Sequence, residues 1–115
     1  MRQHLLEQLS QVIEQRITSG DPQSSYVAQL HHQGINKMLE KVIEETGELV
    51  IAAKDAQVSG DNTQLVSEIA DTFFHILVLL PALDLSLDDI CHELEKRFNL
   101  SGLAEKASRT STNKS

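Results

Sequence analysis

The sequence predicts an all-α protein. Apolar residues recur at helical spacing in successive segments, and glycine or other turn-forming residues separate these segments. No segment alternates apolar and polar residues over the length that a strand needs. The chain has 115 residues, 40% of them hydrophobic, which is enough for one core. We therefore expect one bundle domain of four to five helices over residues 1–107, followed by a polar, disordered tail over 108–115.

The first two helices are expected in the N-terminal third of the chain. Apolar residues from Leu5 to Ile17 recur at helical spacing and predict an amphipathic helix that ends near Gly20. The connector "GDPQSS" follows. A short helix is then expected over about 25–33, since Gly34 suits the left-handed conformation that ends many helices.

Two longer helices are expected in the middle of the chain. The third covers about 35–57, and the turn "VSGDN" leads to a fourth that runs from about Thr63 to beyond Leu80. Asp61 or Asn62 can cap the start of the fourth helix, because their side-chain oxygens can accept hydrogen bonds from its first backbone N–H groups.

The end of the fourth helix and the start of the fifth have local signals. Pro81 lacks a backbone N–H and is expected to kink or end the fourth helix. The stretch "SLDD" predicts a capping box, with Ser86 at the cap and Asp89 three residues later. Cys91 is the only cysteine, so no disulfide framework is expected, and its place on an apolar helix side predicts a small core residue.

Charge and hydropathy restrict the class of partner. The net charge of −7 disfavours nucleic acid and anionic membranes, and a phosphate-containing substrate would need divalent cations to offset the repulsion. The longest apolar run, 76–80 extended by "PAL", is shorter than the roughly 20 residues of a membrane span. The N-terminal stretch lacks the continuous apolar segment of a signal peptide, so we expect a cytoplasmic protein without a membrane partner.

The third helix is expected to have one charged face and one apolar face. At 100° per residue, six charged side chains fall within one arc. They are Lys37, Lys41, Glu44, Glu45, Glu48 and Asp55. Taken alone, such a face is more often solvated surface than a binding site.

The fourth helix makes a binding site the better interpretation. Its polar residues fall in a narrow stripe, and apolar residues cover nearly all the rest of its circumference. The stripe consists of Gln64, Glu68, Asp71, Thr72 and His75. A helix this apolar is usually buried, and buried carboxylates without partners cost several kcal/mol each. Basic residues are too few nearby to pair with all of them.

A divalent cation can serve as that partner. Glu45 and Glu48 are three residues apart on one helix, as are Glu68 and Asp71 on the other, so two antiparallel helices can bring four oxygen ligands together. Such ligands suit Mg²⁺, with Mn²⁺ as a substitute, better than zinc. A salt-bridged bundle interior and a dimer seam are the alternatives.

The motif E-E-x-x-E followed by E-x-x-D, here "EETGE" and "EIAD", resembles the signature of the MazG-like all-α NTP pyrophosphatases. The flanking stretches "DPQSSYVAQLHHQGINKMLEKV", "IAAKD", "ADTFFHILVLL", "LSLDDICHELEKRF" and "SGLAEKASR" resemble the phosphoribosyl-ATP pyrophosphohydrolase family of histidine biosynthesis. The likeness extends from about residue 4 to residue 109. It implies an all-α fold of the MazG-like type, completed by homodimerisation.

The resemblance also implies roles for particular residues. Magnesium ligands are implied at Glu45, Glu48, Glu68 and Asp71, with Glu44 as the first candidate to orient or deprotonate the attacking water and Glu48 as the alternative. Substrate contacts are implied for Lys37 and Lys41 at the phosphates and for Ser25 and Tyr26 at the nucleotide or phosphoribosyl end. Lys54 and Asp55 match a family stretch without a derived role and are kept as substrate-binding candidates.

Plainer interpretations remain open for some of these residues. Lys37 and Lys41 can pair with glutamates along their own helix, namely Glu40, Glu44 and Glu45. Tyr26 can be a core residue with a solvated hydroxyl. His75 also matches a family position, and it is expected to hydrogen-bond the Asp71 carboxylate and orient it, in preference to binding the metal.

The implied reaction is Mg²⁺-dependent hydrolysis of phosphoribosyl-ATP, a small nucleotide, between its α and β phosphates. The products are phosphoribosyl-AMP and pyrophosphate. A short chain with one helix apolar almost all round is also expected to complete its core by pairing with an identical chain. Two rival functions are a house-cleaning pyrophosphatase for ordinary or damaged (d)NTPs and a non-enzymatic helical dimerisation module.

Overall fold

The computed structural model describes residues 4–99, and every regular element in that range is an α-helix, which confirms the all-α prediction. The chain divides into two compact units, one ending at Leu85 and one beginning at Ser86, and each is described by itself. The expected single domain over 1–107 stays a prediction. The expected tail over 108–115 lies outside the described residues.

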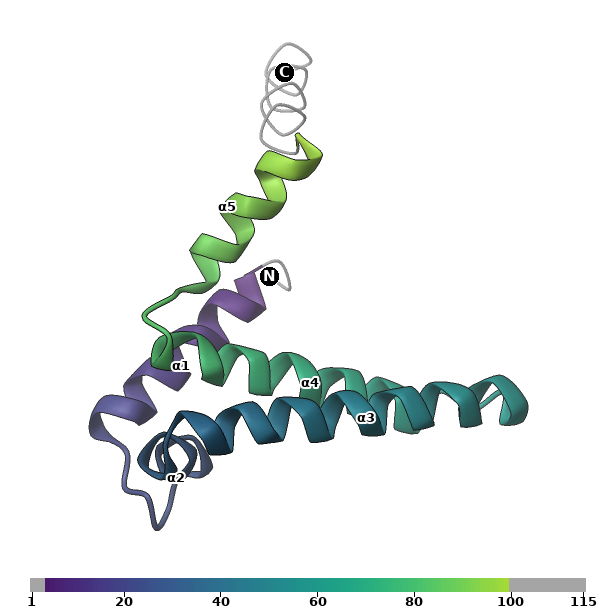
Figure 1. Ribbon diagram of the computed structural model, residues 1–115, viewed down its shortest axis with the longest axis horizontal. Helices are drawn as coiled ribbons and strands as arrows, with labels where there is room; N and C mark the ends of the chain where they lie inside the picture. The colour runs from purple at the N-terminus through teal and green to yellow at the C-terminus, as the bar shows by residue number, and fades with distance from the viewer. Residues whose placement is uncertain (1–3, 100–115) are drawn as a thin grey trace. The chain divides into compact units, whose positions relative to one another are not determined.

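The first two helices are α1 (Leu5–Ser19) and α2 (Tyr26–Gln33), coloured purple and dark blue in Figure 1. At the start of α2 the side chain of Ser25 accepts a hydrogen bond from the backbone N–H of Ala28, at 3.2 Å. At its end Gly34 has a φ of 100°, a conformation that favours glycine because other residues have a Cβ. Both helices begin and end within about one residue of the positions that the sequence predicts.

The helices α3 (Ile35–Ser59) and α4 (Thr63–Ala82) form a long hairpin and make the most extensive contact of any two helices (Figure 1). Gly60 ends α3 in the left-handed conformation, with a φ of 79°. Asp61 then caps α4, since its Oδ1 accepts a hydrogen bond from the backbone N–H of Thr63 at 3.0 Å. Asn62 makes no such side-chain bond. The short turn makes the two helices antiparallel, as expected.

The apolar core of the first unit lies where α1 and α2 meet the N-terminal part of α3 and the C-terminal part of α4. Its larger buried residues are Ile13, Val27, Leu30, Met38, Leu77, Val78 and Leu80. The far part of the hairpin buries only the small side chains of Ala52 and Ala56 among its apolar residues. Pro81 is the last residue but one of α4, so it ends this helix instead of kinking it.

In this single chain, α4 is buried over only part of its circumference, less than its composition suggests. The side chains of Glu68, Thr72 and His75 in the polar stripe are buried, whereas Val66 and Phe73 are 63% and 52% exposed. The helix thus packs these three residues of its polar stripe inward, whereas Gln64 and Asp71 of the same stripe are exposed. Apolar residues of α3 are exposed as well, and Ile43 reaches 74%. We call the following set the exposed apolar residues of the hairpin: Leu39, Ile43, Val50, Ile51, Val58, Val66, Phe73 and Ile76.

By length and composition α4 is apolar enough to cross a membrane, a property that it shares with core helices of soluble proteins. The longest uninterrupted apolar run, 76–80 extended by "PAL", is shorter than the roughly 20 residues of a membrane span. The helix carries Glu68 and Asp71 near its middle, and the Glu68 side chain is buried inside the unit. A membrane span is therefore a weak interpretation of α4.

The second unit contains α5 (Leu87–Phe98). Its N-terminus confirms the predicted capping box: the Ser86 side chain accepts from the backbone N–H of Asp89 at 3.3 Å, and the Asp89 carboxylate accepts from the backbone N–H of Ser86 at 2.9 Å. Cys91 is a free, exposed thiol, so its assignment as a core residue is wrong for the described unit. Burial of a helix position requires another element packed against it, which residues 86–99, the described part of this unit, do not supply.

Candidate metal centre

Three of the predicted metal ligands lie together between α3 and α4. One carboxylate oxygen of each of Glu45, Glu48 and Glu68 lies within 4.8 Å of the others. Glu45 and Glu48 share one side of α3 because they are three residues apart, and the antiparallel course of α4 brings Glu68 to them. We call these three residues the acidic cluster. Carboxylate oxygens in this number suit a hard divalent cation that keeps part of its water shell.

Two members of the acidic cluster are buried. Glu45 is 7% exposed and Glu68 is 8% exposed. The Oε2 atoms of both are fully buried and have no hydrogen-bond partner among the described residues. Buried polar atoms in proteins are nearly always paired, and an unpaired buried carboxylate is costly. A cation bound between α3 and α4 would give these buried carboxylates a partner, so the residues present fit a divalent metal.

Glu48 shows the concentration of negative charge most directly. Repulsion from Glu45, and then from Glu68, raises the pKa of the Glu48 carboxyl above its ordinary 4.5. Glu48 is also the exposed member of the cluster. The acidic cluster therefore has two buried oxygen ligands and one that solvent or a substrate can reach.

A cavity of about 200 Å³ adjoins the acidic cluster. It is lined by Glu48, Ile51, Ala52, Asp55, Gln64 and Glu68. The cavity leaves room beside the carboxylates for water molecules or a phosphate group. Asp55 lines the wall of this cavity together with Glu48 and Glu68, but it is not a member of the acidic cluster.

Lys41 lies at the edge of the acidic cluster. Its Nζ is 3.0 Å from Oε2 of Glu44 and 3.8 Å from Oε1 of Glu45. The hydrogen bond with Glu44 raises the pKa of Lys41 and lowers the pKa of the exposed Glu44 carboxyl. Lys41 thus pairs first with Glu44 and only at longer range with Glu45. One ammonium group cannot balance the three carboxylates of the cluster.

Gln64 makes the remaining polar contact to the cluster. Its Nε2 donates a hydrogen bond of 2.7 Å to Oε1 of Glu68, one helical turn later on α4. The sequence places Gln64 on the polar stripe but indicates no role for it. The signal was the i,i+4 spacing to Glu68, at which a glutamine amide can reach a carboxylate on the same helix face.

The fourth predicted ligand, Asp71, is exposed and lies outside the acidic cluster. Its carboxylate contributes to raising the pKa of Tyr26, so its charge acts at the neighbouring Tyr26 hydroxyl. The structure therefore brings together three of the four predicted ligands. Metal binding by Asp71 stays a prediction.

Tyr26 and His75 form a hydrogen-bonded link between α2 and α4. The Tyr26 hydroxyl is 2.9 Å from Nε2 of His75, and Nδ1 of His75 is 2.8 Å from the backbone carbonyl of Asp71. A carbonyl oxygen only accepts, so Nδ1 carries a proton, and the hydroxyl donates to Nε2 when the ring is neutral. His75 was expected to bond the Asp71 carboxylate. Its partner is the main-chain carbonyl of the same residue.

Burial raises the pKa of Tyr26 above its ordinary 10.0, and the charges of Glu45, Glu44 and Asp71 add to this effect while Lys41 opposes it. Of the acidic cluster, Glu45 alone contributes to this shift, so Tyr26 is electrostatically coupled to the Glu45 end of the cluster. The side chain is nevertheless 45% exposed, and its ring stacks on Phe74 with centroids 6.2 Å apart. Tyr26 is therefore not the core residue that one interpretation of the sequence allowed.

The other predicted substrate contacts make local bonds. Ser25 is buried and caps α2. Lys37 pairs with Glu40 at 3.7 Å, as the plainer interpretation of this lysine expected. Lys54 is exposed on α3. Contact of these residues with a substrate remains a prediction.

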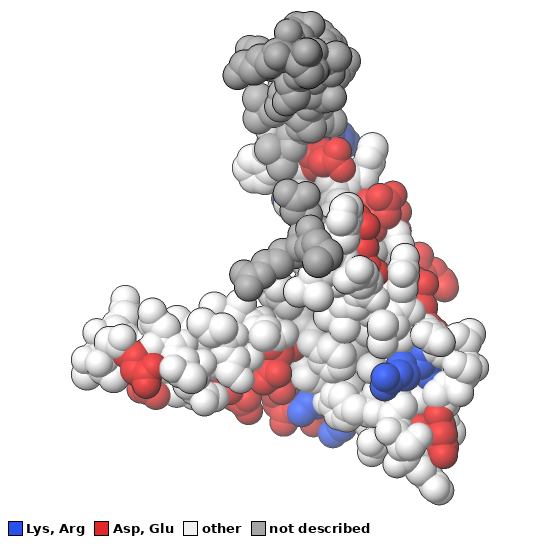
Figure 2. Space-filling view, turned by 180° about the vertical axis from the view of Figure 1, so that it is seen from behind, with Lys and Arg blue, Asp and Glu red and all other residues white. Residues whose placement is uncertain are grey.

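Figure 2 shows acidic side chains in a row along one edge of the hairpin, beside a few basic ones. The rest of the hairpin surface in this view is largely uncharged, which agrees with the exposed apolar residues of the hairpin.

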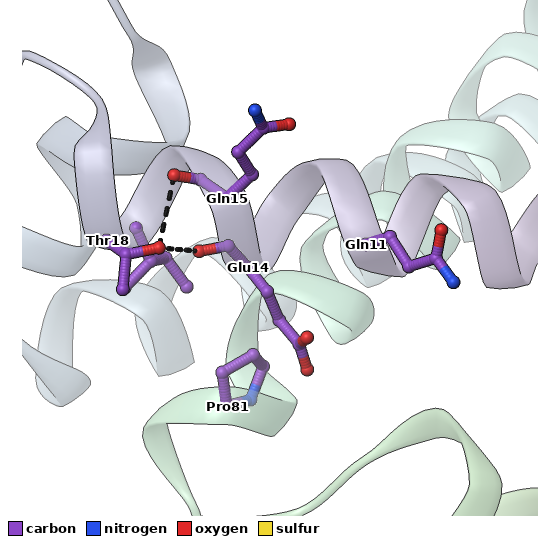
Figure 3. A pocket seen from close by; sticks show the side chains of 6 residues that line it. Gln11, Glu14, Gln15, Thr18 and Pro81 are labelled. Carbon is purple, nitrogen blue, oxygen red and sulfur yellow. Dashed lines mark hydrogen bonds between the residues drawn. The ribbon is translucent and has the colours of Figure 1, made fainter.

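A larger cavity, of about 500 Å³, lies between α1 and the end of α4 (Figure 3). It is lined by Gln11, Glu14, Gln15, Ile17, Thr18 and Pro81. The Thr18 hydroxyl beside it donates to the main-chain carbonyls of Glu14 and Gln15, at 2.7 and 3.3 Å. No predicted site residue is among its lining residues, so size alone does not identify the site.

The fold and the site define a small helical protein built around a carboxylate cluster that fits a divalent cation. Residues 6–98 match the family model of phosphoribosyl-ATP pyrophosphohydrolase, and the chain belongs to this family. It is accordingly a hydrolase that acts on a phosphoric anhydride, in a family of histidine biosynthesis that uses a nucleotide substrate and is commonly metal-dependent. The resemblance seen in the sequence is confirmed, and the non-enzymatic dimerisation module is excluded.

Proposed function

We propose that this chain hydrolyses phosphoribosyl-ATP between its α and β phosphates, giving phosphoribosyl-AMP and pyrophosphate, with Mg²⁺ or Mn²⁺ held by the acidic cluster. One observation carries the proposal. The buried carboxylates of Glu45 and Glu68, each with an Oε2 atom that has no partner among the described residues, lie together with the exposed carboxylate of Glu48 in a chain of this family. Asp71 is proposed as a further ligand on the basis of the motif alone.

The bound cation would neutralise charge that builds on the phosphate oxygens during the reaction. The protein's own groups then have to hold and activate a water molecule. Glu44 is exposed beside Lys41, and its lowered pKa keeps it ionised and able to accept a hydrogen bond from water. Glu48 has a raised pKa and is the stronger base of the two. We keep Glu44 as the residue that orients the water and Glu48 as the alternative base.

Binding of the negatively charged substrate would also depend on the lysine side chains that lie beside the acidic cluster. Lys41 is half-buried, and its raised pKa keeps it charged, so it is proposed to contact a phosphate together with Lys37 on the same helix. The exposed ring of Tyr26 and the hydroxyl of Ser25 are proposed to contact the nucleotide or phosphoribosyl end. The capping role uses the Ser25 oxygen as an acceptor and leaves its proton free to donate.

Lys54 and Asp55 are proposed as further substrate contacts at the far side of the site. Asp55 lines the cavity beside Glu48, and Lys54 precedes it on α3. Their opposite charges fit a role at a polar part of the substrate or at waters around it.

We further propose that two copies of the chain associate and that the dimer acts in the cytoplasm. The exposed apolar residues of the hairpin include Ile43, Val50, Val66 and Phe73, each more than half exposed in the single chain. Large exposed apolar side chains on a soluble protein usually mark an interaction surface. A second identical chain is the simplest partner that would cover them.

A substrate panel tests the reaction. Phosphoribosyl-ATP and the common dNTPs are incubated separately with the protein and Mg²⁺, and pyrophosphate release is measured. We expect preferential turnover of phosphoribosyl-ATP, and loss of turnover in Glu68→Gln but not in Glu7→Gln, which changes an exposed glutamate on α1. Preferential turnover of dNTPs would support the house-cleaning pyrophosphatase instead. Complementation of a histidine auxotroph that lacks this step gives an independent check.

A further inference from the structure

Gln64 is the described residue whose amide is hydrogen-bonded to a carboxylate of the acidic cluster. Its Nε2 donates to Oε1 of Glu68 at 2.7 Å, a short distance typical of a bond to a charged acceptor. The other oxygen of the same carboxylate, Oε2, is fully buried and has no protein partner among the described residues. The amide therefore occupies one oxygen of Glu68 and leaves the other one open.

The bond also restricts how the Glu68 side chain can turn. Glu68 is 8% exposed, so its carboxylate has little water to bond with. Loss of the amide would leave both oxygens without a partner from the protein. Rotation of the terminal carboxylate is otherwise soft, because torsions of this kind have broad minima. A fixed donor on one oxygen thus decides where the second oxygen lies.

The chemical type of the donor matters as well. A lysine at the same position would form an ion pair with Glu68 and compete with a divalent cation for its charge. The amide of Gln64 is neutral, so it orients the carboxylate and leaves its full negative charge for the cation. Both residues line the cavity of about 200 Å³, together with Glu48, which places this bond at the wall of the candidate site.

We propose that Gln64 is a positioning residue that holds the Glu68 carboxylate with Oε2 turned toward the divalent cation. The inference rests on the proposed cation site in the acidic cluster and adds a residue that the motif of acids does not include. Groups that orient metal ligands in this way typically change metal affinity about 10- to 100-fold when they are removed.

The first test substitutes Gln64→Met, which keeps the length of the side chain and its helix propensity and removes the amide. Mn²⁺ binding to the whole chain is measured by calorimetry, and thermal unfolding is measured without metal. We expect Mn²⁺ to bind about 10- to 100-fold more weakly, in a protein that still unfolds cooperatively and whose unfolding midpoint falls by less than about 8 °C, as loss of one hydrogen bond predicts. Gln57→Met, at an exposed glutamine of α3, is the matched control and should bind Mn²⁺ normally.

The second test substitutes Gln64→Lys, which replaces the neutral amide with a charged donor. Oε1 of Glu68 therefore keeps a hydrogen-bond partner. We expect a folded protein that again binds Mn²⁺ more weakly than the original one. Mn²⁺ affinity within twofold of the original in either Gln64 variant would overturn the inference, as would an equal loss in Gln57→Met. Absence of saturable Mn²⁺ binding in the unsubstituted protein would instead refute the proposed cation site, so the two failures are distinguishable.

Discussion

In an ordinary helical hairpin, apolar side chains lie in the seam between the two helices and charged ones lie outside. In the hairpin of α3 and α4 this distribution is reversed for several residues. Inside the seam lie the carboxylates of Glu45 and Glu68, both nearly inaccessible. Outside lie Ile43 and Phe73, which are 74% and 52% exposed. An isolated hairpin would be more stable with the apolar side chains in the seam and the carboxylates in solvent. This arrangement supports both proposals made above: a cation would give the carboxylates of the seam a partner, and a second chain would cover the apolar side chains outside it.

The largest expected effect comes from neutralising the seam. Glu45→Gln removes one of two buried carboxylates, so we expect kcat/KM to fall about 10²- to 10³-fold at fixed Mg²⁺. The metal-free protein should become more stable, by about 1 kcal/mol, because a buried charge without a full partner is removed. Turnover of phosphoribosyl-ATP and unfolding in a chelator measure the two effects. If Glu45→Gln were less stable than the original protein in the chelator, the buried Glu45 carboxylate would not be a destabilising charge, and the argument for a cation in the seam would fail.

The outer side is tested by introducing a charge there. Ile43→Asp places a carboxylate among the exposed apolar residues of the hairpin, and we expect the dissociation constant of the dimer to rise about 30-fold, equivalent to about 2 kcal/mol. Sedimentation over a range of protein concentrations measures it. Gln29→Asp, at an exposed polar position on α2, should leave association unchanged. If the unsubstituted protein is monomeric at high concentration, the outer side needs another explanation.

A smaller effect is expected at the link between α2 and the hairpin. Tyr26→Phe removes the hydroxyl that bonds Nε2 of His75 and leaves a buried ring nitrogen without this partner. We expect the free energy of unfolding to fall by about 1 kcal/mol, with Mn²⁺ affinity within twofold of the original. Chemical denaturation and calorimetry measure these quantities. Loss of Mn²⁺ binding in this variant would show that the link, and not the seam alone, supports the metal site.

The smallest expected effect is a pH dependence of stability and of Mn²⁺ affinity, caused by Glu48 in the seam. The raised pKa of Glu48 means that its contribution to stability in the metal-free protein is present below the ordinary 4.5 and is lost as the pH rises through the raised value. A cation must displace this proton, so Mn²⁺ affinity should fall as the pH is lowered through that same raised value. Calorimetry at several pH values measures the slope. In Glu48→Gln, the part of the dependence of Mn²⁺ affinity on pH that comes from Glu48 should vanish. An unchanged dependence on pH would mean that the displaced proton belongs to another group.

The fold could be predicted from the sequence to within a few residues, because its signals are local. Gly34 ends α2 in a conformation that suits glycine, Gly60 does the same for α3, and Ser86 with Asp89 forms the capping box of α5. Such signals depend on the chemistry of neighbouring residues and need no knowledge of the rest of the molecule. The exposure of Cys91 could not be predicted in this way, since burial depends on what packs against the helix.

The acidic cluster was predictable in part for a similar reason. Helical spacing fixes Glu45 and Glu48 on one side of α3, but it does not fix how α4 is rotated against that side. Glu68 and Asp71 are both on the polar stripe, and only contacts between the helices decide that Glu68 faces the cluster and Asp71 does not. The partner of His75 was missed because the spacing of side chains says nothing about which main-chain carbonyl is in reach.

The turn at Gly60 has a consequence for how such a site comes into being. Because the turn joins α3 directly to α4, one short segment of the chain, residues 45–68, contains every carboxylate of the acidic cluster. A nascent chain can bring these groups together before α5 has left the ribosome, since the N-terminal parts of a chain can fold during synthesis. The same contiguity lets duplication or grafting of a single segment carry all three acids into another helical protein at once.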